Sequence, residues 1–132
     1  GGLGLGLRAF CNAHPESGAQ LAIQLTGIEN ELKDADYLVT GEGRTDSQTE
    51  NGKLCMELAK LCRRKKVPAI LLSGFAEGNP GGLFQRIYSA TENPGDSFEE
   101  IRRTAPENLR KAAEKTIRDL IYPSNPYFAK QS

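Results

Sequence analysis

The pattern of apolar and polar residues predicts strands and helices in alternation through the middle of the chain. A short β-type run, Tyr37–Val39, is followed by a long polar segment, and Lys53–Arg64 then has the spacing of an amphipathic helix. The apolar stripe of this helix consists of Leu54, Leu58 and Leu61. Ala69–Leu72 is an unbroken apolar run, typical of a strand that is buried on both faces, and Ser73-Gly74 ends it.

The segments before the first strand are less regular. Ala19–Leu25 fits either a helix or a strand, and Ile28–Leu32 has the pattern of a short helix. Gly1–Ala13 is rich in glycine, which disfavours a helix. Its large apolar residues nevertheless fall at the spacing of one helix face: Leu3, Leu7 and Phe10. Two readings remain open: a helix packed closely against a partner or ligand, or a frayed end.

The C-terminal half of the chain predicts one weak strand and a long helical region. Arg86–Ala90 is the strand candidate. Capping boxes at Ser97–Glu100 and Thr104–Glu107 predict helix starts, with Pro106 near the first helical position of the second. Helical spacing then continues to Ile121, and the residues 123–132 are expected to form a loose tail.

This order of elements predicts the α/β fold class. Strands that alternate with helices form a parallel sheet with helices on its faces, as in three-layer Rossmann- and flavodoxin-like folds. We expect residues 1–122 to belong to one such unit, with Tyr37–Val39 and Ala69–Leu72 as neighbouring strands. Ligands of these sheets bind at the carboxyl ends of the strands. The segments after Val39 and Leu72 are therefore the places to search for a site.

Composition narrows the possible partners. The chain of 132 residues has 17 basic and 17 acidic residues, so it lacks the positive excess expected for binding nucleic acid or an anionic membrane. No apolar run is long enough to span a membrane. The three cysteines, Cys11, Cys55 and Cys62, are odd in number and widely spaced. We interpret them as buried free thiols in a reducing cytoplasm.

The polar segment Thr40–Lys53, TGEGRTDSQTENGK, is the strongest candidate for chemistry. It is long for a strand-to-helix connection and dense in glycine and charge, a combination more typical of a functional loop than of a plain link. Its glycines would let backbone N–H groups approach an anion, and the helix that follows would offer its N-terminus to phosphate. It is not a Walker A loop, because Ser47 stands at the first glycine position and Leu54 follows Lys53.

Residue types assign candidate roles in phosphoryl transfer. Arg44 and Lys53 would contact phosphate or carboxylate groups, and Asp46 would accept a hydroxyl proton or bind magnesium. The expected substrate- and phosphate-binding residues are Gly41, Glu42, Gly43, Gln48, Thr49, Gly52, Ser73 and Gly74. A structural loop whose charges pair with one another is the alternative, and composition leaves it open.

The same residues carry a family resemblance. The order Thr40, Gly41, Glu42, Gly43, Arg44, Asp46, Gln48, Thr49, Gly52 and Lys53 resembles the signature of the glycerate kinases of the bacterial glyoxylate and glucarate pathways. The resemblance extends over the chain to about Ile121 and covers the C-terminal portion of that family. The chain departs from the family pattern at Cys55, which stands where proline is common, and at Glu57, which stands where glycine is common.

The resemblance implies ATP-dependent phosphorylation of D-glycerate with Mg²⁺, which would give 2-phosphoglycerate or 3-phosphoglycerate. It also implies that this chain is an incomplete part of a larger two-domain kinase, whose N-terminal part supplies the rest of the site. The alternative is a non-enzymatic α/β module, or a decayed remnant, that binds a phosphate-bearing ligand or a partner subunit. The fragment alone is expected to be inactive.

Overall fold

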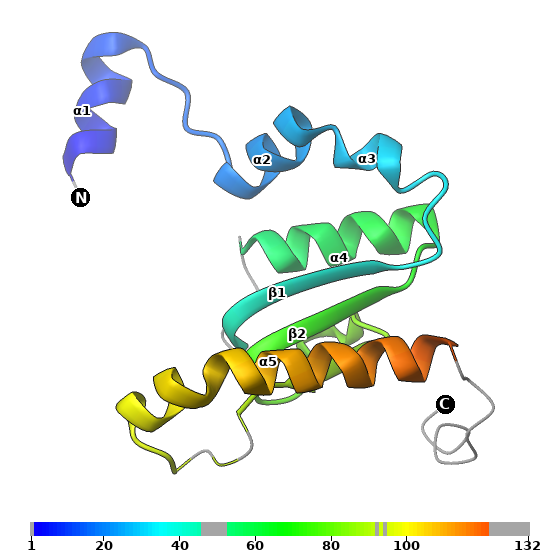
Figure 1. The fold of residues 1–132 in the computed structure, drawn as a ribbon. Helices are drawn as coiled ribbons and strands as arrows, with labels where there is room; N and C mark the ends of the chain where they lie inside the picture. Colours follow the sequence, from blue (N-terminus) through cyan, green and yellow to red (C-terminus); the bar gives the residue numbers. More distant parts are fainter. Residues whose placement is uncertain (1, 46–52, 92, 94, 122–132) are drawn as a thin grey trace.

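The computed structural model describes residues 2–45, 53–91, 93 and 95–121 (Figure 1). Two helices and a short third helix come first: α1 (Gly2–Cys11), α2 (Gly18–Thr26) and α3 (Ile28–Glu31). The strands and the helices that cover them follow: β1 (Leu38–Thr45), α4 (Leu54–Lys65), β2 (Ala69–Ala76), a 3₁₀ turn η1 (Pro80–Gly82), β3 (Arg86–Ser89) and α5 (Phe98–Ile121).

The three strands form one parallel sheet in the order β1-β2-β3. Leu38 lies opposite Ala69, and Ile70 lies opposite Arg86. Parallel neighbours need a crossover, and α4 makes the crossover between β1 and β2. The predicted α/β class and the pairing of the first two strands are therefore confirmed.

Helices cover the two faces of this sheet, as Figure 1 shows, with α4 on one face and α5 on the other. The larger core lies under α4 and includes Met56, Leu61 and Leu71. A smaller core under α5 is formed by Ile70, Tyr88 and Ala112. The result is the predicted three-layer arrangement.

Both long strands extend further than the apolar pattern indicates. Thr40–Thr45 was expected to be the start of a loop and is the second half of β1, and β2 continues past Ser73 to Ala76. The segment is extended because it pairs with β2, with Arg44 opposite Phe75. Pairing with a neighbouring strand outweighs the low strand propensity of a glycine-rich polar run.

The C-terminal helix also differs from the expectation. Ser97 caps it as predicted, since the Glu100 N–H donates to Ser97 Oγ at 3.2 Å. Thr104 does not start a second helix: its hydroxyl donates to the Glu100 carbonyl at 2.9 Å inside one continuous α5, which also contains Pro106.

The N-terminal part of the described chain contains helices but no strand. Ala19–Leu25, for which a helix or a strand was expected, lies in the helix α2. Ser17 caps this helix by accepting a hydrogen bond from the Gln20 N–H at 3.4 Å. α1 is a helix, one of the two possibilities left open for Gly1–Ala13, but it buries no residue, and Figure 1 shows it apart from the sheet. Cys55 and Cys62 are buried free thiols, whereas Cys11 on α1 is exposed, so the prediction of a third buried thiol is wrong.

Candidate phosphoryl-transfer site

The candidate site lies where the second halves of β1 and β2 meet the start of α4. Strand register places Glu42 opposite Ser73, so the two segments singled out by sequence share one end of the sheet, as predicted. Lys53 stands directly before α4, and its Nζ donates to the Arg44 carbonyl oxygen at 3.4 Å. Glu42 and Arg44 on β1 and Lys53 before α4 therefore lie at the end of the sheet where α/β proteins bind ligands.

Two buried hydroxyl groups anchor the carboxylate. Thr45 and Ser73 have 0% and 1% of their surface exposed. Thr45 Oγ1 lies 2.7 Å from Glu42 Oε1 and 2.9 Å from Ser73 Oγ. Ser73 Oγ in turn donates to the Phe75 carbonyl oxygen at 2.6 Å. The Ser73 hydroxyl, expected at a ligand, is therefore directed into the protein and toward Thr45.

The cations are held by backbone and aromatic contacts. The Arg44 guanidinium carbon lies 5.3 Å from the centre of the Phe75 ring, within the range of a cation–π interaction. The contact of Lys53 with the Arg44 carbonyl oxygen joins the start of α4 to the end of β1. Both positive groups therefore lie close to the strand that carries Glu42, where an anionic ligand would be attracted.

Cys55 joins the first turn of α4 to the middle of β1. Its Sγ donates to the Gly41 carbonyl oxygen at 3.3 Å and lies 3.3 Å from Thr40 Oγ1. Burial raises the pKa of the Cys55 thiol, and the negative charge of Glu42 raises it further, against lowering by the Thr40 hydrogen bond and Lys53. A thiol held in its neutral form is a weak nucleophile, so Cys55 serves here as a contact between elements.

The glycines of the site have a packing role that the sequence does not reveal. A Cβ on Gly74 would collide with the Gly43 carbonyl oxygen, and one on Gly41 would lie 3.1 Å from the Leu72 carbonyl oxygen. β1 and β2 can therefore approach closely only because these positions lack a side chain. Their contact with phosphate stays a prediction.

Several predicted site residues fall outside the described residues: Asp46, Gln48, Thr49 and Gly52. Within residues 2–45, 53–91, 93 and 95–121, no group of three His, Cys, Asp or Glu side chains is placed to hold a metal ion. No helix in the described part of the chain has the length and apolar character needed to cross a membrane.

Sequence reasoning missed Thr45 and a second buried polar group, Asp119. The Tyr88 hydroxyl donates to Asp119 Oδ2 at 2.8 Å, and Arg86 Nη1 lies 3.9 Å from the same oxygen. Burial, together with the Asp119 hydrogen bond, raises the pKa of Tyr88. Asp119 could have been noticed in the sequence, because it stands next to Leu120 on the apolar stripe of a predicted helix. Thr45 could not, because its role depends on the strand register.

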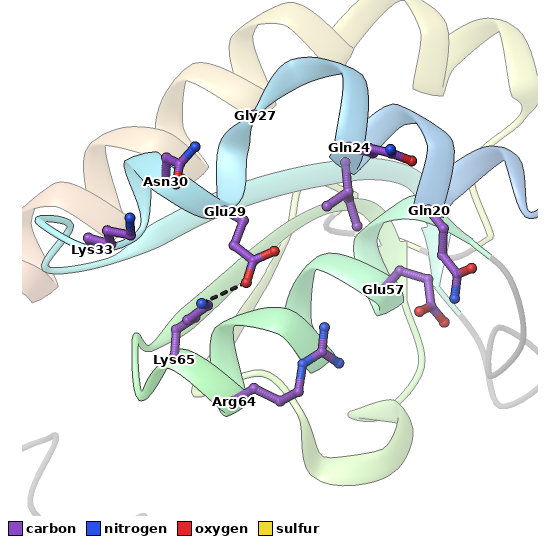
Figure 2. Close-up of a pocket in the computed structure, with 10 residues that line it drawn as sticks. Gln20, Gln24, Gly27, Glu29, Asn30, Lys33, Glu57, Arg64 and Lys65 are labelled. Carbon is purple, nitrogen blue, oxygen red and sulfur yellow. Dashed lines mark ion pairs between the residues drawn. The ribbon is translucent and has the colours of Figure 1, made fainter.

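Two of the cavities among the described residues adjoin the layers. One, of about 560 Å³, lies between the sheet and α5, and its lining includes Glu42, Leu72 and Leu109. The other, of about 590 Å³, lies between α2, α3 and α4 (Figure 2). Figure 2 shows the Lys65 ammonium directed at Glu29, 2.6 Å away, and this pairing lowers the pKa of Glu29. The described residues that line this second cavity belong to α2, α3, α4 and the turns before and after α3, so it is separate from the strand ends.

Fold and site together describe an α/β protein with charged side chains at the carboxyl end of its parallel strands. Residues 1–121 match the glycerate kinase family, and the chain belongs to this family. It is 32% identical over 127 residues to the glycerate kinase of Bacillus subtilis (strain 168), a match that covers 91% of this chain and 31% of the relative. It is 29% identical over 117 residues to the glycerate 2-kinase of Escherichia coli (strain K12), covering 86% and 30%.

A solved structure agrees with this assignment. The crystal structure of a protein from Salmonella typhimurium LT2, assigned as a glycerate kinase 2, superposes with a TM-score of 0.71 at 30% identity. The superposition covers 93% of this chain and 32% of that protein. The chain therefore spans about a third of the length of the relatives that it matches over most of its own length.

Proposed function

We propose that this chain is the C-terminal part of an ATP-dependent kinase that phosphorylates D-glycerate. The observation that carries the proposal is the gathering of Glu42, Arg44 and Lys53 at one edge of the sheet, in a chain of the glycerate kinase family. Phosphoryl transfer depends mainly on positioning and on neutralising charge, and this end of the sheet carries two cationic residues and a carboxylate.

Each group has a role in the proposed reaction. Arg44 and Lys53 bind the phosphate oxygens of ATP or the carboxylate of glycerate, and the N–H groups around Gly41 and Gly43 add weaker contacts. Gln48, Thr49 and Gly52 complete the ligand contacts. The glycerate hydroxyl oxygen forms a bond to the γ-phosphorus, the bond from that phosphorus to the β-phosphate oxygen breaks, and ADP leaves.

Magnesium fits the donors that the segment offers. Kinases hold Mg²⁺ through one or two carboxylates together with the substrate phosphates. Asp46 is the proposed carboxylate, and Mg²⁺ would neutralise charge on the phosphates when bound. For the product we favour 2-phosphoglycerate, because a relative that matches 86% of this chain carries the name glycerate 2-kinase.

The rest of the enzyme is proposed to pack against this chain. On the described residues β1 pairs along one edge, with β2, and α1 exposes Leu3, Leu5 and Phe10 by 79%, 72% and 89%. Residues 1–122 would complete an α/β domain with the N-terminal part, and residues 123–132 would follow it as a tail. As for other enzymes of central metabolism that consume ATP, we place the reaction in the cytoplasm.

The test is a coupled ADP-release assay on the complete enzyme and on the 132-residue chain, with the product identified by ³¹P NMR. We expect the complete enzyme to form 2-phosphoglycerate and the isolated chain to show no ordinary turnover, because transfer needs both substrates in near-attack geometry. A complete enzyme that binds ATP but transfers nothing to glycerate would favour the alternative, a non-enzymatic module or remnant.

A further inference from the structure

A line of short contacts leads from Glu42 into the protein. Glu42, Thr45, Ser73 and the Phe75 carbonyl oxygen are joined in that order by oxygen–oxygen distances of 2.7, 2.9 and 2.6 Å. All three distances are typical of O–H···O hydrogen bonds. Thr45 and Ser73 are buried, and of these four residues only Glu42 has a titratable side chain.

The number of hydroxyl hydrogens in this line of contacts shows that the line has room for one more proton. Thr45 and Ser73 have one hydroxyl hydrogen each, but three contacts need three hydrogens. With Glu42 as a carboxylate, Thr45 donates to Glu42 and Ser73 donates to Phe75, so no hydrogen is left between the two hydroxyls. With a hydrogen on Glu42, the carboxyl donates to Thr45, Thr45 to Ser73, and Ser73 to Phe75. All three contacts are then complete.

Among the four residues of this line of contacts, Glu42 is the one that can take up the additional proton from the cavity or from solvent. Thr45 and Ser73 are 0% and 1% exposed, whereas Glu42 is half-buried at the candidate site and lines the cavity beside the sheet. Among the described residues, Arg44 follows two positions later on the same strand, and Lys53 at the start of α4 contacts the Arg44 carbonyl oxygen. The negative charge of Glu42 adds to the burial that raises the pKa of the Cys55 thiol.

We propose that Glu42 accepts the proton of the glycerate hydroxyl during phosphoryl transfer, and that Thr45 and Ser73 are positioning residues for it. The inference rests on the proposed function and moves the proton acceptor from Asp46 to Glu42. The alcohol O–H hydrogen passes to the Glu42 carboxylate as the oxygen bonds to the γ-phosphorus and ADP leaves. Thr45 and Ser73 turn their hydroxyl hydrogens inward, and Glu42 later releases its proton to solvent.

The test uses four variants of the complete enzyme. Glu42→Gln keeps the shape of the side chain but cannot take up the proton, and we expect kcat to fall on the order of 10²–10⁴-fold. Thr45→Val keeps the shape and removes the hydroxyl, and we expect a roughly tenfold loss of kcat with unchanged KM values. Thr45→Ser restores the hydroxyl and should restore most of kcat, even with a lower melting temperature.

Thr116→Val is the matched control, because Thr116 is 1% exposed and its hydroxyl donates to the Ala112 carbonyl oxygen at 2.8 Å within α5. We expect it to lower the melting temperature and leave kcat unchanged. An active wild type whose Glu42→Gln variant keeps more than about a tenth of kcat would overturn the role of Glu42 alone. Equal kcat values for Thr45→Val and Thr45→Ser would overturn the positioning role. A wild type that does not phosphorylate glycerate would overturn the proposed function and this inference with it.

Discussion

The two helices that cover the sheet differ in how much they bury. α4 has 12 residues and buries most of its inner surface: Cys55, Met56, Leu58, Ala59, Leu61 and Cys62. α5 has 24 residues and buries far fewer: Ala112, Thr116 and Asp119. Leu109 and Ile117, placed on the apolar stripe of α5 by their spacing, are 49% and 52% exposed.

The difference indicates that α4 covers its face of the sheet with packed side chains, whereas α5 covers the opposite face only in part. The α4 core includes Leu71 of β2, the strand that carries Ser73, and catalytic groups need such support to keep their geometry. On the α5 side, a polar network of Tyr88, Arg86 and Asp119 takes the place of a continuous apolar core. Exposed apolar residues on α5 are suited to contact another part of a larger protein.

The largest expected effect is on kcat, and it compares a cation at the start of α4 with a cation on α5. In the complete enzyme, Lys53→Met should lower kcat on the order of 10²–10³-fold, because it removes a cation that stabilises charge on the transferred phosphoryl group. Lys115→Met is the control on α5, where the Lys115 ammonium lies 5.9 Å from the centre of the Tyr88 ring. Steady-state kinetics on both variants is the measurement, and an equal loss in the two would remove the functional distinction between the faces.

The second prediction separates the faces by packing. Leu61→Ala should lower the free energy of unfolding of this chain by about 2–5 kcal/mol, because Leu61 is 1% exposed and its loss leaves a cavity in the α4 core. Leu109→Ala, on α5, should cost under about 1 kcal/mol, because about half of the Leu109 surface is already exposed. Urea unfolding followed by circular dichroism measures both. Similar losses at the two leucines would mean that Leu109 of α5 is packed in this chain as tightly as Leu61 of α4.

A third change addresses the polar network under α5. Tyr88→Phe removes the hydroxyl that donates to buried Asp119, and an unsatisfied buried acceptor should cost about 1–3 kcal/mol of unfolding free energy. Tyr37→Phe is the control, since Tyr37 is 41% exposed and should tolerate the change with little effect. Thermal melts of both variants measure the difference. No loss in Tyr88→Phe would show that Arg86 alone satisfies Asp119.

The smallest effect concerns alkaline pH. Burial raises the pKa of both α4 thiols, Cys55 and Cys62, above the ordinary value of 9.0. Above that value the unfolded chain releases these protons while the folded chain keeps them, so the free energy of unfolding should decrease as pH rises. Urea unfolding at neutral pH and at about pH 10 tests this. Cys62→Ala should make the decrease shallower, and an unchanged slope would contradict burial as its cause.

Periodicity in the sequence was enough to predict the order of the elements from α3 onward and the parallel sheet. It misplaced the ends of the strands because they depend on pairing: Thr40–Thr45 is extended only against β2. It also divided α5 at Thr104, because a capping pattern is local and does not reveal that the turn before it is already helical. The exposure of Cys11 was missed for a related reason, since burial depends on what lies beside α1.

For the candidate site, the sequence by itself determined the chemistry available: three carboxylates, two cations and several glycines within the polar segment Thr40–Lys53. Tertiary structure decided which groups act together. Thr45 and Ser73 are 28 positions apart, and their hydroxyls meet only because β1 and β2 pair in one register. Gly74 is needed only because that register directs the Gly43 carbonyl oxygen at it. Local patterns reflect the preferences of neighbouring residues, whereas the register is set by contacts between distant segments, and those contacts form only when the sheet folds.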